Sequence, residues 1–499
     1  MKGTPFTPRW TALLVCLVLT LAVYGNTFRN QWTYDDLPVV VQNPDARSLD
    51  SFLRNQVPGR PLRELSYLVD HTLFGDQPAG YRMQQLGWHA ANGFLLVLLC
   101  QAVGLEFPFA LLAGALFLVH PLQAESVANV AHRKELLALF FCLSALLLYL
   151  KAVAAERSRR WWGALCSLAA FGCALLANET AVTLPLAVVL AECLFVPRER
   201  RLLLRRPLLL AIVAGTVAAL LAYHYRGLVS PAQLLTVYSK NNFNATSDYL
   251  PLVFGSLTAF GFYLEKIVLP LGLAPEYVFH LSASPWQPWA WLAGGLLVAL
   301  ISAMVLLRRR LPPVAFGIGW FLIFWLPVSN LVPVAYLAAD RYMYLCLPGV
   351  ALAGAALCGQ LRKKWASAVA VPLILAWSLL TVIQNGYWRN EHTLWRHAVR
   401  VNADSTWVQG AAAQSYLATG ELDEARRHAR AALALSSYNV GAYQILARVE
   451  ERCGNLAAAL RNYQLFVALG QVDFPDEMAE AELHVRLLKA RLKLMKEQR

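Results

Sequence analysis

Long apolar stretches separated by short polar segments occupy most of the chain between residues 11 and 383. A helix needs about 20 residues to cross the hydrocarbon core of a bilayer, and several stretches approach that length. The pattern therefore predicts an all-α fold with a polytopic membrane domain. We expect eleven membrane spans, at residues 11–25, 86–103, 106–119, 134–150, 161–177, 181–196, 207–223, 288–307, 313–328, 342–358 and 365–383.

Basic residues between these stretches predict which side of the membrane each loop occupies. Lysine and arginine collect in short cytoplasmic loops, and Lys2 and Arg9 place the N-terminus there. The strong basic clusters lie within residues 151–160, 198–206, 308–310 and 362–364. If all four are cytoplasmic, residues 26–85 form the first outer loop, and the chain beyond the last span is also outside.

One apolar stretch conflicts with this assignment if it spans the membrane. Residues 250–269 are apolar enough to cross, but a span there would move the two following basic clusters to the outer side. We therefore expect a re-entrant or surface-lying helix at residues 250–269, buried against protein where it enters the membrane.

Composition and charge support a membrane protein and argue against nucleic acid as a partner. The 499 residues are 58% hydrophobic and 15% charged, with a formal net charge of +13. In a soluble protein such a charge would suggest nucleic-acid binding, but here the basic residues mark topology. Eight of the nine cysteines lie in apolar stretches, so no disulfide framework is predicted. The first apolar stretch lacks a clear signal-peptide cleavage site and is interpreted as an uncleaved span.

The chain becomes polar and alanine-rich from about residue 386 and contains an internal repeat. Gly420 and Gly454 are 34 residues apart, and two further matched pairs, Leu422 with Leu456 and Ala425 with Ala459, keep the same period. This period resembles that of tetratricopeptide repeats, which stack helix pairs into an α-solenoid.

The repeat divides the chain into two predicted domains. Residues 1–385 form the membrane domain and residues 386–499 the repeat domain on the outer side. Flanking helices near residues 388–402 and 476–497 are expected to cap the two repeats. Because the concave surface of such repeats usually holds extended peptide, we expect Tyr416 and Tyr443 to contact a polypeptide acceptor.

Two adjacent carboxylates, Asp35 and Asp36, follow the first predicted span beside aromatic residues. Neighbouring side chains of an extended loop point to opposite sides. One carboxylate can therefore serve as a general base while the other binds a metal or orients the loop. The alternative is a solvated turn that marks the end of the span.

Charged groups at the other predicted outer turns are also candidates, because ionisable residues at membrane level are costly. Arg60, Arg133 and Arg341 present planar guanidinium groups that suit phosphate oxygens. The alternatives are ion pairs within the turns or arginines that anchor helices at the headgroups. Supporting polar residues at these turns are Arg63, His89, His120, Glu125 and Glu179.

Several common catalytic motifs are missing from these turns. The sequence near them contains no glycine-rich nucleotide loop, no Walker motif, no HExxH pair and no Cys-His cluster. Nucleotide hydrolysis and zinc chemistry are therefore unsupported. A negatively charged headgroup with a lipid tail would suit acidic and arginine groups gathered at one membrane surface.

The order of the polar motifs resembles one known family. The motifs are residues 32–36 (Trp-Thr-Tyr-Asp-Asp), 59–62 (Gly-Arg-Pro-Leu), 120–128 (His-Pro-Leu-Gln-Ala-Glu-Ser-Val-Ala), 329–331 (Ser-Asn-Leu) and 341–345 (Arg-Tyr-Met-Tyr-Leu). With the terminal repeats, they resemble the transmembrane and tetratricopeptide-repeat protein O-mannosyltransferases, of the GT-C glycosyltransferase class. Asn178 and His132 stand where this family tends to carry lysine and glycine.

The resemblance implies a membrane enzyme that transfers mannose or another hexose from a polyprenyl-phosphate donor to a hydroxyl of a protein or an envelope glycan. Asp35 or Asp36 would be the catalytic group, and the arginines would hold the donor phosphate. The resemblance identifies no cofactor, leaves a divalent cation as an alternative, and makes the lipid-linked sugar a substrate. The compact loops favour a bacterial inner-membrane protein with periplasmic repeats, or an endoplasmic-reticulum protein if the source is eukaryotic. The alternative function is a scaffold that recruits envelope-assembly partners through the repeats.

Overall fold

The fold is helical throughout the part of the chain that the computed structural model describes. The described residues are 8–55, 59–206, 215, 249–279, 286–331, 334, 336–470 and 474–498, and none of them lies in a β-strand. The predicted all-α class is therefore confirmed. Contacts divide the chain into two compact units, residues 1–273 with 279–389 and residues 274–278 with 390–499. The short segment 274–278 thus belongs to the second unit.

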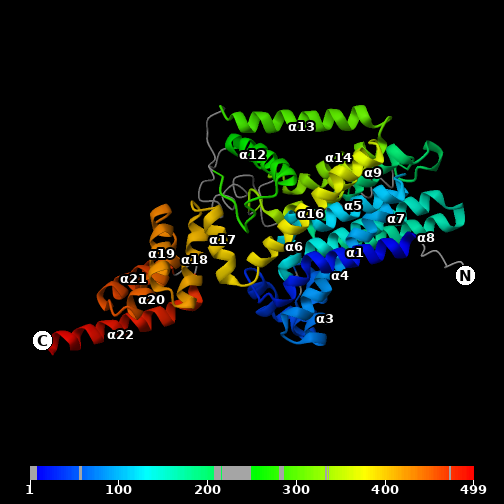
Figure 1. The fold of residues 1–499 in the computed structure, drawn as a ribbon. Helices are drawn as coiled ribbons and strands as arrows, with labels where there is room; N and C mark the ends of the chain where they lie inside the picture. The colour runs from blue at the N-terminus through cyan, green and yellow to red at the C-terminus, as the bar shows by residue number, and fades with distance from the viewer. Residues whose placement is uncertain are drawn as a thin grey trace, which may run out of the picture. The chain divides into compact units, whose positions relative to one another are not determined.

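Helices, most of them apolar, build the first unit (Figure 1). The helices are α1 (Pro8–Tyr24), α2 (Leu49–Arg54), α3 (Pro61–Phe74), α4 (Pro78–Ala102), α5 (Phe107–Val119), α6 (Ala124–Ala128), α7 (Arg133–Ala154), α8 (Arg157–Ala177), α9 (Leu184–Phe195), α12 (Tyr249–Val268), α13 (Pro288–Leu307), α14 (Pro312–Trp325), α15 (Leu347–Cys358) and α16 (Lys363–Tyr387). Many begin with proline in the first turn, where the missing N–H costs no helical hydrogen bond.

Five helices of the described chain are long and apolar enough to cross a membrane, which confirms a polytopic membrane protein. They are Pro8–Arg29, Val130–Ala154, Arg160–Ala177, Pro288–Leu307 and Lys363–Tyr387. A sixth candidate is the pair Phe107–Val119 and Pro121–Ala128, bent by 54° at the break.

The remaining predicted spans have different outcomes. Two of them coincide with shorter apolar helices, Pro312–Val328 and Leu347–Cys358. The span at 86–103 coincides with the second part of α4 and ends one residue beyond it. The span at 181–196 is divided between a short 3-10 turn and α9, which ends at Phe195. The span at 207–223 lies outside the described residues. Residues 249–268 form one continuous helix, α12, and the expectation that it lies on or within the membrane surface remains a prediction.

Short 3-10 turns at the helix ends carry most of the polar candidates. They are η4 (Pro121–Gln123), η5 (Val130–His132), η6 (Glu179–Thr183), η8 (Leu326–Val328) and η9 (Asp340–Met343). The turn η9 packs against η4 and α6, while η6 packs against α7 and η8. Turns that are far apart in the sequence are therefore gathered at one end of the helices.

Helices α14 and α15 approach each other closely at two glycines. A Cβ on Gly317 would clash with the carbonyl oxygen of Gly349, and a Cβ on Gly349 would clash with that of Gly317. Small residues at a helix crossing let backbones approach in this way within membranes. Because α15 follows η9 directly, this crossing also fixes the turn that carries Arg341.

The second unit consists of antiparallel helix pairs with a fixed repeat. Its helices are α17 (Glu391–Val401), α18 (Thr406–Thr419), α19 (Leu422–Leu435), α20 (Val440–Arg452), α21 (Leu456–Leu469) and α22 (Met478–Glu497). The starts of α18 and α20, and those of α19 and α21, are 34 residues apart, the period predicted from the sequence. Gly420 and Gly454 have φ values of +83° and +81°, a left-handed conformation that glycine adopts at a helix end without steric cost.

The glycine crossing gives a direct test of the packing of α14 against α15. We expect Gly349→Val to lower the stability of the purified protein by about 2 kcal/mol, because the added side chain overpacks a backbone contact. Gly354→Val is the matched control, since a Cβ there meets no heavy atom within 4 Å. Thermal denaturation in detergent measures both variants, and equal stability of the two would contradict the crossing.

Candidate active site

The first outer loop holds its two aspartates in different environments. Tyr34 has a φ of +55°, a left-handed conformation that is uncommon for a residue with a side chain. Of the two residues that follow it, Asp35 has a side chain that is 36% exposed, whereas the side chain of Asp36 is fully buried. The structure therefore separates the two carboxylates: Asp36 faces the protein interior and Asp35 remains accessible.

Asp36 attaches the first loop to the second. Its carboxylate accepts hydrogen bonds from the backbone N–H of Ala131 at 2.9 Å and of Thr33 at 3.3 Å. The buried guanidinium of Arg82 lies 3.7 Å away and donates to the carbonyl of Gln31 at 2.7 Å. Burial raises the pKa of Asp36 to about 6, even though Arg82 and the two amides oppose the shift. These contacts give Asp36 a positioning role.

Asp35 stands at one end of a chain of charged and polar groups. Its carboxylate lies 3.8 Å from Nε2 of His132, and the same nitrogen lies 3.4 Å from a carboxylate oxygen of Glu125. Both ring nitrogens of His132 are buried. Glu125 in turn accepts hydrogen bonds from the backbone N–H of Arg341 at 2.8 Å and from its guanidinium at 2.6 Å.

Arg341 remains charged although it is buried. Its guanidinium lies over the rings of Tyr336 and Tyr342, at 4.9 and 5.5 Å from the ring centres. Burial alone would lower the pKa of Arg341, but Glu125 reverses this effect and raises the pKa well above its usual value. Tyr34 interacts electrostatically with both Asp35 and Arg341, so the aspartate and the arginine belong to one cluster.

A second arginine extends the cluster toward η6. Arg60 donates two hydrogen bonds to Glu179, from Nε at 3.1 Å and from Nη2 at 2.7 Å, while both side chains remain partly exposed. Burial would raise the pKa of Glu179, but Arg60 more than offsets this and lowers the pKa to about 2. Lys134 lies 3.5 Å from Glu135. It interacts electrostatically with the Arg60–Glu179 pair and with Arg341, so both pairs belong to one charged cluster.

Arg133, predicted to hold the donor phosphate, is instead occupied within the protein. Its guanidinium is fully buried, 2.5 Å from Asp70, and donates to Gln85 at 3.1 Å and to the carbonyl of Tyr81 at 2.9 Å. The guanidinium also lies 5.0 Å from the ring centre of Tyr67. Phosphate binding at Arg133 would require breaking these contacts, so the structure gives Arg133 a role in packing.

Three other predicted supporting residues also make polar contacts within the fold. Arg63 lies 2.5 Å from Glu64. The buried ring of His89 contacts the Tyr344 hydroxyl at 2.8 Å and the Leu118 carbonyl at 3.2 Å. His120 contacts the Ile267 carbonyl at 3.0 Å. These residues connect helices around the cluster.

The two tyrosines predicted to bind an acceptor pack within the second unit. Tyr416 is buried and stacks on His428 with ring centres 5.2 Å apart. Tyr443 is half-buried against the apolar core that includes Tyr463 and Phe466. Both therefore contribute to helix packing.

Sequence reasoning missed three cluster residues: His132, Lys134 and Glu135. The available signal was a run of four ionisable residues, 132–135, at the start of an apolar stretch. Within the described residues, no group of three histidine, cysteine, aspartate or glutamate side chains is arranged to hold a metal ion.

Fold and cluster together define a polytopic helical membrane protein whose charged groups converge at helix ends. Residues 71–224 match the family model described as dolichyl-phosphate-mannose-protein mannosyltransferase. The chain is 24% identical to protein O-mannosyl-transferase Tmtc3 of Drosophila melanogaster over 564 residues, covering 95% of this chain and 60% of that protein. It is also 24% identical to human TMTC2, covering 84% of this chain and 62% of that protein.

A shorter match has higher identity: 31% to Tmtc1 of Drosophila melanogaster over 194 residues, or 36% of this chain and 22% of that protein. In the two longer matches, this chain spans about 60% of the length of the related protein. No solved structure matches significantly. The comparisons confirm the relationship predicted from the motifs: the chain is related to the transmembrane and tetratricopeptide-repeat protein O-mannosyltransferases.

The packing role of Arg133 predicts a loss of stability on substitution. We expect Arg133→Met to destabilise the protein by about 3–5 kcal/mol, because Asp70 would be left as an uncompensated buried charge. Arg54→Met is the control, since Arg54 is 79% exposed and pairs with Asp50 on the surface. Such exposed pairs contribute roughly 0–1 kcal/mol. Thermal denaturation measures both, and a fully stable Arg133→Met protein would contradict the assignment.

Proposed function

We propose that this protein is a membrane glycosyltransferase. It moves mannose or another hexose from a polyprenyl-phosphate donor to a serine or threonine hydroxyl of a protein, or to an envelope glycan, on the extracytoplasmic side. The observation that carries the proposal is the accessible Asp35 carboxylate, linked through His132 and Glu125 to Arg341. A carboxylate can take the proton from the acceptor hydroxyl, and a cation in the same cluster can stabilise the departing phosphate.

The proposed reaction uses Asp35 as the general base. Its carboxylate takes the proton of the acceptor hydroxyl, and the hydroxyl oxygen forms a bond to the anomeric carbon of the sugar. The bond between that carbon and the phosphate oxygen breaks, and its electron pair stays on the lipid phosphate. Asp36 positions this step by holding the loop to Ala131 at 2.9 Å.

Three cations would stabilise the charge on the departing phosphate. Glu125 holds the guanidinium of Arg341 in place, and Glu179 holds that of Arg60. Lys134 interacts electrostatically with both arginines. Preorganised charge of this kind is worth more at a site shielded from water than in solution. A guanidinium offers five N–H donors, and the pair with Glu179 engages two of the three guanidinium nitrogens of Arg60. A phosphate can therefore be bound without breaking that pair.

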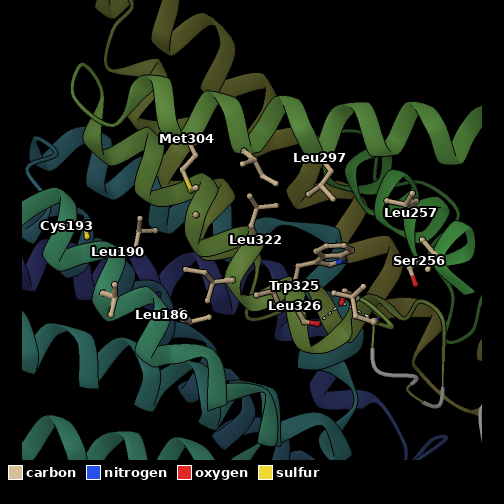
Figure 2. Close-up of a pocket in the computed structure, with 17 residues that line it drawn as sticks. Leu186, Leu190, Cys193, Ser256, Leu257, Leu297, Met304, Leu322, Trp325 and Leu326 are labelled. Carbon is tan, nitrogen blue, oxygen red and sulfur yellow. Dashed lines mark hydrogen bonds between the residues drawn. The ribbon is translucent and has the colours of Figure 1, made fainter. Parts of the chain in front are cut away.

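An apolar cavity of about 620 Å³ supports a donor with a lipid tail (Figure 2). Leucines of α9, α12, α13 and α14 line it, with Met304 and Trp325. Ser329 and Leu331, just after η8, also belong to the lining, and η8 packs against η6, the turn that carries Glu179. The lining of the cavity thus includes a turn, η8, that packs against the turn of Glu179, and this neighbourhood supports a tail and a headgroup of one molecule.

The repeats are proposed to hold the polypeptide acceptor. Because Tyr416 and Tyr443 pack within the unit, exposed side chains would make the contact, such as Tyr438, which is 80% exposed. The proposed location is a bacterial inner membrane with the N-terminus in the cytoplasm and the repeats in the periplasm, or the endoplasmic reticulum in a eukaryote.

Transfer of labelled sugar tests the catalytic assignment. The purified full chain in lipid nanodiscs is given a polyprenyl-phosphate mannose and an acceptor peptide mixture. We expect Asp35→Asn to lower the rate by about 10²–10⁴-fold, because general-base catalysis is lost. Asp50→Asn, in the same loop and 69% exposed, should retain the wild-type rate. Full activity of Asp35→Asn would exclude the base; absence of transfer by the wild type with every donor would favour the scaffold.

The tail cavity makes a separate prediction about donor length. Leu297→Trp places a larger side chain in the cavity wall formed by α13. We expect the KM for a long polyprenyl donor to rise about tenfold, equivalent to about 1.4 kcal/mol of lost binding. The rate with a donor shortened to two isoprene units should stay unchanged. An equal effect on both donors would show that the cavity does not hold the tail.

A further inference from the structure

A second, separate feature is a buried carboxylate on α9. Glu192 is fully buried and accepts hydrogen bonds from the backbone N–H groups of Leu202, Leu203 and Leu204 at 2.6, 3.0 and 2.9 Å. The hydroxyl of Tyr149 donates to the same carboxylate at 2.5 Å. A carboxylate with this many donors is well compensated for its burial. Glu192 therefore fixes the backbone of the loop that follows α9.

The fixed loop closes one side of a second apolar cavity. Leu202 and Leu203 are buried and line a cavity of about 250 Å³ together with side chains of α7, α8 and α9. The lining includes Tyr149, whose hydroxyl donates to Glu192, so the residue that helps to hold the loop also lines the cavity. This cavity shares no lining residue with the larger one described above.

Cationic and aromatic groups surround this cavity. The guanidinium of Arg206 lies 4.8 Å from the ring centre of Trp161, which lines the cavity and is 49% exposed. Arg201 donates to the carbonyls of Val196 at 3.1 Å and Cys193 at 3.2 Å, so it is held near the end of α9. Residues 198–206 contain five arginines and one glutamate.

We propose that the loop 198–206 and the cavity between α7, α8 and α9 form a binding site for an anionic phospholipid, with one acyl chain in the cavity and the phosphate on the arginines. This site is independent of the proposed glycosyl transfer. Two of the three helices involved, α7 and α8, are candidate membrane spans. Arginine and tryptophan together at a helix end are typical of the membrane interface.

The two-part character of the site defines its ligand. An apolar cavity alone would accept the chain of any lipid, and an arginine cluster alone would attract any anion. The Arg206–Trp161 contact places both features at one position. The ligand must therefore carry a net negative headgroup and an acyl chain, which excludes inorganic phosphate and makes phosphatidylcholine a weak competitor.

Photo-crosslinking of a phosphatidylglycerol that carries a diazirine in one acyl chain tests the site. The full chain in nanodiscs is irradiated, and crosslinked peptides are mapped by mass spectrometry. We expect label on residues 161–168, displaced by unlabelled phosphatidylglycerol but not by phosphatidylcholine. Arg205→Gln with Arg206→Gln should lower half-maximal labelling affinity about tenfold or more, because two positive charges that attract an anionic headgroup are removed.

The matched control removes the same charge elsewhere. Arg309→Gln with Arg310→Gln changes a basic run at the end of α13 that lines neither cavity, and should leave labelling unchanged. A second variant, Ala164→Trp, fills the cavity and should abolish labelling while all the arginines remain. Equal loss in both arginine variants, or label concentrated on other peptides, would overturn the proposal. Should the Arg205/Arg206 variant misfold, lipid competition on the wild type still decides.

Discussion

The energetic cost of burying charge beside a membrane determines how the first unit is built. An ionised side chain removed from water costs several kcal/mol unless a partner and hydrogen bonds compensate it. Glu125 meets that requirement through Arg341, 216 residues later in the chain, and Arg133 meets it through Asp70. Each pairing joins segments from distant parts of the sequence. The same requirement that stabilises the helix ends therefore assembles the charged cluster.

Properties that depend on local periodicity could be predicted from the sequence. Apolar length predicted the membrane helices, and the 34-residue spacing predicted the period at which the helices of the second unit recur. Both signals arise within one helix or one helix pair, so they need no knowledge of distant partners. The polar turns were also identified, because charge at the end of an apolar stretch is conspicuous.

The orientation of individual side chains could not be predicted, because distant residues decide it. The sequence predicted that the side chains of Asp35 and Asp36 point to opposite sides, but which of them faces the interior depends on Ala131, 95 residues away. Arg133 and Lys134 are neighbours on a helix, where successive side chains are about 100° apart. That rotation directs Arg133 toward Asp70 and Lys134 toward the cluster. Tyr416 fitted the repeat spacing because it packs against His428, which is a structural role.

The hairpin architecture of the second unit has a consequence for how such proteins diversify. Each helix pair contacts mainly its neighbours, as α19 does with α20 and α21 with α22. In such linear arrays, stability is close to a sum of local terms, so whole units can be gained or lost without redesigning the rest. Duplication of one 34-residue module would lengthen the array while leaving the packing of the first unit unchanged. The length of the array and the architecture of the membrane helices can thus evolve as separate traits.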